Sequence, residues 1–181
     1  MRFNILLTTI GRPSLVTMLD SIIPQLSEED IVTVVIDGMS CYTDTVKAVT
    51  KTHSRCKFLV NHSNLGHWGH ASRNKFQNGL QGDFIINADD DDTFLPDAME
   101  KIRKHCTEEK LYIFQMNFNG TLIPKNHKIE FANIGTPCGV IPNTQNLPDW
   151  WLRYGGDFDF YNALSKQMDY EFIDEVIYKV R

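Results

Sequence analysis

Uncharged β-branched runs alternate with helical patterns along the first part of the chain. Residues 3–9 (FNILLTT) and 31–36 (IVTVVI) carry no charge, which is typical of strands buried on both faces of a sheet. Between them, five apolar residues recur at helical spacing before Pro24 limits the helix: Leu15, Met18, Leu19, Ile22 and Ile23. The alternation continues with a helix over 44–51, a strand over 57–60, a helix over 70–80, a strand over 84–87 and a helix over 96–106.

This order of elements predicts an α/β fold with an open, mostly parallel central sheet. Ligands of such sheets usually bind at the carboxyl ends of the strands. Thr8, Thr9, Asp37 and the aspartate run 89–92 all fall at such ends. We therefore expect the functional site to be assembled from these positions.

Beyond residue 110 the pattern changes to that of α+β material packed on the first half. Residues 111–118 predict a strand, Gly120 a turn, 128–132 a hairpin partner and 170–180 a late strand. The segment 135–154 is rich in Pro, Asn and Gly, so we expect a functional loop there and not an interdomain linker. The whole chain is expected to form one domain.

Composition and charge narrow the class of protein. The 181 residues carry 18 Lys and Arg against 23 Asp and Glu, a net charge of −5, so nucleic acid is not an expected partner. With 42% hydrophobic residues the chain can bury a sizeable core. No apolar run approaches the roughly 18–20 residues that cross a bilayer, and the opening segment lacks signal-peptide features. We expect a soluble, cytoplasmic protein without a membrane span.

Four cysteines are scattered along the chain: Cys41, Cys56, Cys106 and Cys138. None forms a C-x-x-C pair, which favours free thiols in a reducing compartment over a disulfide framework or a zinc site. His62, His67 and His70 cluster near Trp68, but they lack cysteine partners or acids at metal-ligand spacing. Polar contacts in a loop are the favoured interpretation for these histidines.

The most informative stretch is the run of four aspartates at 89–92, directly after the apolar residues 84–87. Adjacent carboxylates repel one another unless a cation or several hydrogen-bond donors compensate them. Mg²⁺ and Mn²⁺ take oxygen ligands and commonly bridge one or two carboxylates to substrate phosphates. The run therefore indicates a metal-bound diphosphate. The alternative is a solvated acidic turn that caps the helix beginning near Pro96.

A second motif overlaps the same run. Asp89-x-Asp91-x-Thr93 matches the D-x-D-x-T of haloacid-dehalogenase-like phosphatases, in which the first aspartate is the nucleophile. That motif normally lies near the start of a chain, and here it does not. The phosphatase remains an alternative function, and a non-catalytic nucleotide-sugar-binding module is another.

Four separated segments together resemble family 2 glycosyltransferases of the GT-A fold. They are 6–22 (LLTTIGRPSLVTMLDSI), Asp37, the stretch 64–74 with its Asn-Leu-Gly and Ala-Ser-Arg-Asn elements, and 88–96 (ADDDDTFLP). Their order and spacing match those of the family. The resemblance implies the nucleotide-diphospho-sugar transferase fold, in which about 1–100 would bind the nucleotide sugar and about 101–181 would form the acceptor side.

The resemblance implies a metal-dependent hexosyl- or deoxyhexosyltransferase that uses a UDP-sugar or another nucleotide-sugar donor. Six residues would bind the donor: Thr9, Arg12, Asp37, Arg73, Asp89 and Asp90. Asp37 would hold the nucleoside base, while Asp89 and Asp90 would contact the ribose side. Asp91 would bind Mn²⁺ or Mg²⁺, which neutralises charge on the leaving diphosphate.

Two of these positions have structural alternatives. Arg73 adds a fixed positive charge near the diphosphate, or forms a structural salt bridge to the aspartate run, and both roles are compatible. Asp37 precedes a glycine, and Asp-Gly is a common turn-forming pair.

Inverting members of the fold also use a general base, usually an aspartate in a late acidic motif at a helix start. Residues 155–160 (GGDFDF) resemble that motif, with Gly156 in place of its glutamate, so the base is either Asp157 or Asp159. We favour Asp157, which occupies the matching position before a helix expected over 161–166. The alternative is that Asp157 is only the N-cap of that helix.

Trp150 and Trp151 lie just before the acidic motif, and we expect one of the pair to face the acceptor, a glycan or glycoprotein. In its small size the chain also resembles glycosyltransferases of large algal viruses. That likeness implies a viral enzyme in the host cytoplasm.

Overall fold

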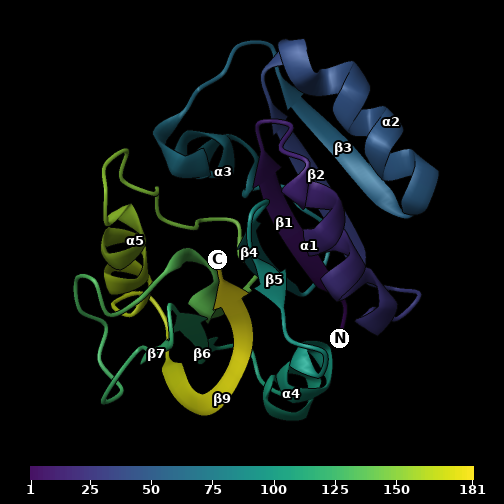
Figure 1. The fold of residues 1–181 in the computed structure, drawn as a ribbon. Coiled ribbons are helices and arrows are strands. Elements are labelled where there is room, and N and C mark those ends of the chain that lie inside the picture. The colour runs from purple at the N-terminus through teal and green to yellow at the C-terminus, as the bar shows by residue number, and fades with distance from the viewer.

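A computed structural model describes residues 1–51 and 53–181 of the chain (Figure 1). Within these residues one nine-stranded sheet runs through both halves of the molecule, in the order β3-β2-β1-β4-β8-β6-β9-β5, with β7 paired to β6. The sheet is mixed: its first four strands are parallel, and antiparallel pairs join them to the second half.

The parallel half contains β1 (Phe3–Thr9), β2 (Ile31–Asp37), β3 (Cys56–Asn61) and β4 (Phe84–Asp89). Three helices connect these strands: α1 (Ser14–Ile22), α2 (Tyr42–Thr52) and α3 (His70–Phe76). Because β1 lies between β2 and β4, its carboxyl end sits beside theirs, and Thr8 pairs with Asp89 across the sheet. The aspartate run therefore begins at the edge where we expected the site.

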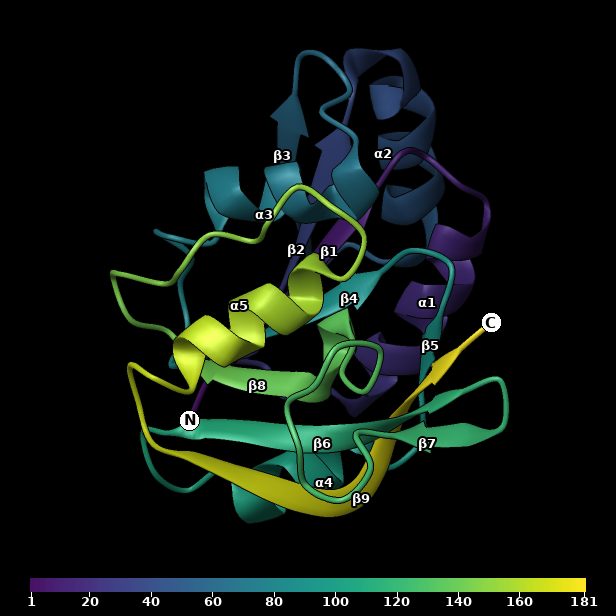
Figure 2. The same cartoon turned by 90° about the vertical axis from the view of Figure 1, so that its left-hand side faces the viewer.

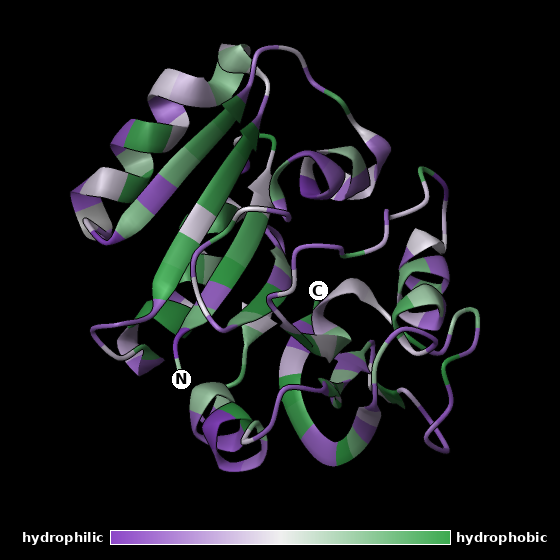
Figure 3. Cartoon of the chain, turned by 180° about the vertical axis from the view of Figure 1, so that it is seen from behind, coloured by the Kyte–Doolittle hydropathy of each residue, from purple (hydrophilic) through white to green (hydrophobic). Residues whose placement is uncertain are grey.

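Burial explains why this half could be predicted. All seven positions of β1 and of β2 are buried, as their uncharged sequences require. Figure 3 shows these strands mostly in the colour of hydrophobic residues. On α1 the buried positions are Leu15, Met18, Leu19 and Ile22. Each such side chain contributes about 1.5–3 kcal/mol relative to an exposed one.

The second half contains β5 (Thr93–Phe94), β6 (Leu111–Phe118), β7 (Thr121–Ile123), β8 (Gly139–Pro142) and β9 (Tyr170–Val180). The short strand β8 lies between β4 and β6, antiparallel to both. Long β9 runs parallel to β6 and bends strongly, as Figure 2 shows, with irregular pairing around Gln115. Helix α4 (Ala98–His105) packs against β9, and α5 (Gly156–Leu164) lies in front of β8 in Figure 2.

Several sequence-based boundaries are wrong. The hairpin partner of β6 is β7, which directly follows the Gly120 turn, and residues 128–132 form no strand. The segment 135–154 is not wholly a loop, because it contains the buried strand β8. That strand has only four residues and includes a glycine and a proline, which both weaken a strand signal.

Two helices also differ from their expected limits. Helix α3 ends at Phe76 instead of near residue 80, and Gly79 just beyond it has a φ of +115° that continues no right-handed helix. Helix α5 begins at Gly156, ahead of the expected 161–166. Both candidate bases therefore lie in its first turn.

All four cysteines are free, as expected. None of the helices in the described part of the chain is long and apolar enough to cross a membrane.

Candidate functional site

A cavity of about 570 Å³ opens at the carboxyl ends of β1 and β4 and is lined by both halves of the chain. The first half contributes Thr8, Thr9, Arg12, Asp37, His70 and the four aspartates. The second half contributes apolar residues and a cluster of polar and aromatic side chains that includes Phe131, Arg153, Tyr154 and Asp157. The cavity thus joins most of the positions that the sequence singled out.

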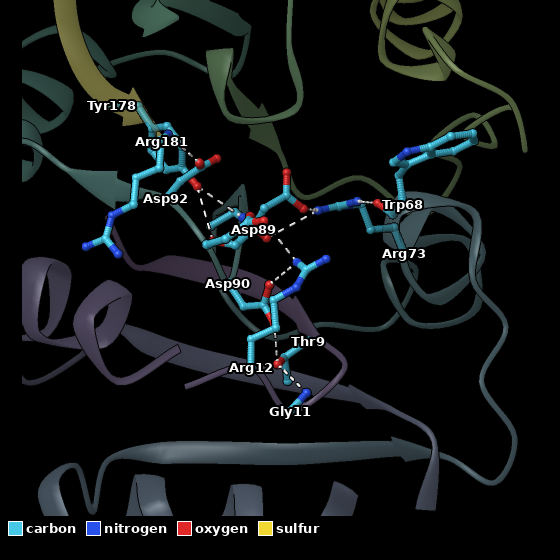
Figure 4. Close-up of polar contacts among 12 residues, drawn as sticks. Thr9, Gly11, Arg12, Trp68, Arg73, Asp89, Asp90, Asp92, Tyr178 and Arg181 are labelled. Atoms are coloured by element: carbon cyan, nitrogen blue, oxygen red, sulfur yellow. Dashed lines mark hydrogen bonds and ion pairs between the residues drawn. The ribbon is translucent and has the colours of Figure 1, made fainter. Parts of the chain in front are cut away.

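Asp90 is anchored by the first strand and the turn after it (Figure 4). Its carboxylate accepts hydrogen bonds from Thr9 Oγ1 at 2.5 Å and Arg12 Nη1 at 2.7 Å, and its side chain is 2% exposed. Thr9 Oγ1 in turn accepts the Gly11 amide N–H at 2.9 Å. The hydrogen bond to Asp90 raises the pKa of the Arg12 guanidinium. The charge of Asp90 is therefore already compensated inside the protein.

Asp89 is paired with a buried arginine on α3. Arg73 Nη2 donates to Asp89 Oδ1 at 2.5 Å and to the Ala88 carbonyl at 3.2 Å, while Nη1 donates to the Trp68 carbonyl at 2.9 Å. Figure 4 shows Arg73 between Trp68 and Asp89. The Arg73 side chain is 0% exposed, so the expected salt bridge to the aspartate run is present. A contact between Arg73 and a donor remains a prediction.

Asp91 and Asp92 differ sharply in exposure. The Asp91 side chain is 51% exposed and meets Arg12 Nη1 at 3.0 Å. Asp92 is buried and accepts the Arg181 amide N–H at 3.1 Å, and burial raises its pKa to about 7. The alternative of a capping acidic turn is wrong, because α4 begins at Ala98 with Asp97 as its N-cap residue.

Asp37 organises the loop that follows β3. Its carboxylate accepts the Leu65 amide N–H at 2.9 Å, the Gly66 amide N–H at 3.0 Å and Asn61 Nδ2 at 3.0 Å. Gly38 has a φ of +120° and a ψ of +130°, which favours glycine but is not the geometry of a tight Asp-Gly turn. Asp37 also lines the cavity, and its contact with a nucleoside base remains a prediction.

The structure separates the two candidate bases. Asp157 lines the cavity, is partly buried, and has a pKa that burial raises. Asp159 lies outside the described lining and forms a two-bond ion pair with Arg153, at 2.8 Å to Nε and 2.8 Å to Nη2. The N-cap alternative for Asp157 is wrong, because Gly155 occupies the N-cap position of α5.

Gly156 has a packing reason for replacing the glutamate of the related motif. A Cβ atom at this position would lie 2.1 Å from the Trp151 carbonyl oxygen and 2.6 Å from His70 Nδ1. Contacts this short are not tolerated without moving the backbone. A glutamate therefore does not fit here.

Trp150 is too deeply buried to contact an acceptor, so the expectation for the pair rests on Trp151. Trp150 is only 1% exposed, and its ring stacks on Phe160 with 3.9 Å between the ring centroids. Its Nε1 donates a hydrogen bond to Gln77 Oε1 at 2.9 Å. Trp151 is 59% exposed but lies outside the described lining of the cavity. Its contact with an acceptor remains a prediction.

Helix α3 clamps the segment that leads to Asp157. Asn74 Nδ2 donates to the Trp150 carbonyl at 2.9 Å and its Oδ1 accepts the Trp150 amide at 2.7 Å. One helical turn earlier, His70 Nδ1 lies 3.1 Å from the Trp151 carbonyl. Burial lowers the His70 pKa to about 4, so the ring is neutral and donates from Nδ1. The same helix that supplies Arg73 to Asp89 therefore fixes the approach to α5.

Sequence reasoning missed the exposed aromatic residues of the cavity: Trp68, Phe131 and Tyr154. Trp68 was noted only as a neighbour of histidines. A signal was present in the glycines at 66 and 69 that flank it, since both have positive φ and place Trp68 in a tight turn. Tyr154 likewise precedes Gly155, whose φ is +79°, whereas Phe131 gave no such signal.

A divalent cation fits the aspartate edge without a preformed cage. Among the described residues no three His, Cys, Asp or Glu side chains gather into a metal-binding group. The Asp91 side chain nevertheless lines the cavity at 51% exposure, with its Oδ2 3.0 Å from Arg12 Nη1. Mg²⁺ is commonly held by one or two carboxylates and completed by substrate phosphates and water. Asp91 is therefore the carboxylate of the run best placed for a cation.

Comparisons with known proteins agree with this architecture. The family model described as Glycosyl transferase family 2 matches residues 5–166. The crystal structure of S. aureus TarS 1-349 with UDP-GlcNAc is 16% identical, with a TM-score of 0.75, over 99% of this chain and 58% of that one. Mannosyltransferase PcManGT from Pyrobaculum calidifontis, with GDP-Man and Mn²⁺, is 11% identical, with a TM-score of 0.73, over 97% of this chain and 56% of that one.

These likenesses show the GT-A fold that the sequence led us to expect. The chain spans about 60% of the TarS 1-349 structure, so the activity of that longer protein is not thereby shown for this chain. A comparison with curated proteins gave no match. Neither S. aureus nor Pyrobaculum calidifontis is a virus, and the expected viral origin has no support.

Proposed function

The chain belongs to glycosyl transferase family 2, and on that basis we propose that it is a metal-dependent, inverting glycosyltransferase. It transfers a sugar from a nucleotide sugar, most readily a UDP-sugar, to a hydroxyl group of a glycan or glycoprotein. One observation carries this proposal: a single cavity is lined by Asp89 and Asp91 from the first half and by Asp157 from the second. A departing diphosphate and an attacking hydroxyl group need such groups around one sugar.

The similar structures support a nucleotide-sugar donor. S. aureus TarS has crystal structures in complex with UDP-GlcNAc and with UDP, and PcManGT has a structure in complex with GDP-Man and Mn²⁺. For this chain we propose that Asp37 meets the nucleoside base and that Asp89 and Asp90 meet the ribose. Thr9 and Arg12 hold Asp90 in place, since both already donate to its carboxylate.

Asp91 is proposed to hold Mn²⁺ or Mg²⁺, and a bound ion supplies Lewis-acid stabilisation to the leaving diphosphate. The remaining positive charge near this edge comes from two arginines of the chain. Arg12 is about half exposed, while Arg73 is buried. Arg12 can therefore turn toward a phosphate, whereas Arg73 acts through the position of Asp89.

Asp157 is proposed as the general base. It removes the proton of the acceptor hydroxyl group while the acceptor oxygen bonds to the anomeric carbon. The bond from that carbon to the diphosphate oxygen breaks on the opposite face, and the electron pair leaves with the nucleotide. The raised pKa of Asp157 strengthens it as a proton acceptor near neutral pH.

The phosphatase alternative is wrong. The chain belongs to a different family, whose model spans Asp89 and its surroundings. The carboxylate of Asp89 is also bound by Arg73, which lowers its availability as a nucleophile.

The proposed activity can be tested by measuring nucleotide release. We expect one of UDP-glucose, UDP-GlcNAc, UDP-galactose or GDP-mannose to release its nucleotide in the presence of Mn²⁺. Asp91→Asn should slow this release by about 100-fold or more, because charge stabilisation at the leaving group is lost. The matched control is Asp44→Asn on the exposed first turn of α2, which should keep the parental rate.

Two outcomes would contradict the proposal. Parental release by Asp91→Asn would remove Asp91 from the metal site. Saturable binding of a nucleotide sugar, with neither hydrolysis nor transfer under any condition, would instead identify a binding module.

A further inference from the structure

Three exposed aromatic side chains stand in the lining of the cavity. Trp68 is 63% exposed, Tyr154 is 72% exposed and Phe131 is 52% exposed. They come from three separate segments, before α3, before α5 and after β7. Apolar rings gathered at the mouth of a cavity are a feature of ligand-binding surfaces.

The three rings form a connected wall. Trp68 and Tyr154 meet edge to face with 6.2 Å between centroids and an interplanar angle of 71°. Phe131 and Tyr154 meet in the same way, at 6.2 Å and 70°. Edge-to-face contacts, unlike stacked ones, leave broad ring faces free to pack against a ligand.

The backbone holds this aromatic wall in place. Trp68 has a left-handed conformation, with φ of 51° and ψ of 32°, which bulky residues rarely adopt. Its carbonyl accepts a hydrogen bond from Arg73, the residue that binds Asp89. An unfavourable conformation that the surroundings enforce is frequent at ligand sites. Arg73 therefore connects the backbone of Trp68 to Asp89, a proposed donor-binding residue.

The opposite end of the wall is tied to the proposed base. A Cβ atom at Gly155 would lie 2.2 Å from the Phe131 ring, so this ring packs directly on the start of α5. Asp157 is two residues further along. The loop that carries Phe131 is braced by Asn133, whose side chain bonds to the backbone of Lys125 and Lys128.

The chemistry around the wall suits a sugar ring. One face of a pyranose presents C–H groups that pack on the electron-rich face of an aromatic ring. The hydroxyl groups at its edge need hydrogen-bond partners, and the same lining offers the Asp157 carboxylate and the Arg153 guanidinium. Asp159 fixes Arg153 through two hydrogen bonds.

We propose that Trp68, Tyr154 and Phe131 form the acceptor subsite and stack on a sugar ring, so that the hydroxyl group that is glycosylated belongs to a saccharide. This inference rests on the proposed function and narrows its acceptor to a saccharide hydroxyl group that is bound on these three rings. The acceptor sugar packs on the aromatic wall and directs a hydroxyl group toward Asp157. A serine or threonine side chain and a linear lipid alcohol do not offer the flat C–H face that the wall matches.

Saturation-transfer difference NMR tests the inference with defined probes. The protein, saturated with UDP and the diamagnetic ion Mg²⁺, is mixed with the methyl glycosides of glucose, GlcNAc, galactose and mannose, with β-linked disaccharides of these sugars, and with a serine-containing peptide. We expect saturation of the ring C–H protons of at least one saccharide and none for the peptide. Trp68→Ala and Tyr154→Ala should weaken the binding of that saccharide at least tenfold, and Trp68→Phe should retain part of it.

The controls separate this inference from the function on which it rests. Tyr170→Ala removes another exposed aromatic ring that also makes an edge contact, to Phe172, but lies outside the described cavity lining, so saccharide binding should not change. UDP affinity and thermal stability are measured for every variant. Normal UDP binding without saccharide binding would overturn the acceptor subsite alone. Loss of UDP affinity in Trp68→Ala would also overturn it, because the Trp68 ring would then contact the nucleoside. Absence of UDP binding by the parent protein would instead count against the proposed function.

Discussion

Four aspartates of identical chemistry have different surroundings at the carboxyl end of β4. Asp90 is buried against Thr9 and Arg12, Asp89 pairs with Arg73, and Asp91 stays half exposed. Asp92 is buried against the end of β9. Substitutions in this run should therefore have distinct effects. Those at Asp92 act on the fold and those at Asp91 act on function, while those at Asp90, which is buried and also lines the cavity, act on both.

The two late aspartates give the sharpest contrast between neighbouring side chains. Asp157→Asn should lower transfer by about 10²–10⁴-fold, because the amide cannot accept the acceptor proton. Its affinity for the nucleotide should remain that of the parent. Asp159→Asn should lose only the ion pair with Arg153 and change transfer much less. Steady-state transfer and nucleotide titration check both, and the reverse ranking would assign the base to Asp159.

Asp92 should make the stability of the metal-free protein depend on pH. Burial raises its pKa from the ordinary 3.8 to about 7 in the folded state. Between these values the folded protein binds more protons than the unfolded chain, so stability is highest at acidic pH and falls as pH rises toward 7. Asp92→Asn should remove this part of the decline. Thermal denaturation from pH 4 to pH 8 measures it, and an equal slope in both proteins would contradict the assignment.

At the scale of elements, α3 connects the two sides of the cavity. Its Arg73 meets Asp89, while Asn74 and His70 hold the backbone before α5. These contacts follow helical spacing, since residues on one face of a helix recur every three or four positions. A helix of seven residues therefore positions both the aspartate run and the proposed base.

Loss of the Asn74 clamp should loosen the approach to α5. Asn74→Ala removes two hydrogen bonds to the Trp150 backbone and should destabilise the fold by about 1–3 kcal/mol. Transfer should fall further than nucleotide affinity, because the displaced group is Asp157. The control for chemical denaturation and kinetics is Asn146→Ala, which replaces an exposed asparagine in the loop between β8 and α5. Unchanged stability in Asn74→Ala would show that the clamp is not needed.

Local patterns predicted the elements of the first half well. Strands β1 and β2 are uncharged and wholly buried, and α1 follows its apolar spacing. Strand β8 escaped prediction because its four residues are defined by partners far along the chain, where Phe84 faces Pro142. Trp150 was misplaced for a related reason: sequence indicates a large ring but not whether Phe160 and Gln77 cover it.

At the scale of the whole molecule, one sheet brings two dissimilar halves around a single cavity. The parallel half supplies the aspartate edge, and the second half supplies Asp157 and most of the aromatic wall. The motifs that resemble glycosyltransferases identified residues of the lining where the motif lies at a strand or helix end, as for Thr9, Asp37 and Asp157. The partners of those residues were not predictable, since Arg12 and Asp90 are 78 residues apart.

The central claim is that this edge binds a nucleotide through a metal at Asp91. Thermal denaturation with UDP, GDP, CMP and their sugar conjugates, each with and without Mn²⁺, tests it most directly. At about 100 times the dissociation constant, a ligand of the folded state should raise the Tm by roughly 5–10 °C. The account predicts such a rise for one nucleotide only with Mn²⁺, and its loss in Asp91→Asn. No rise with any nucleotide, or an equal rise in Asp91→Asn, would contradict it.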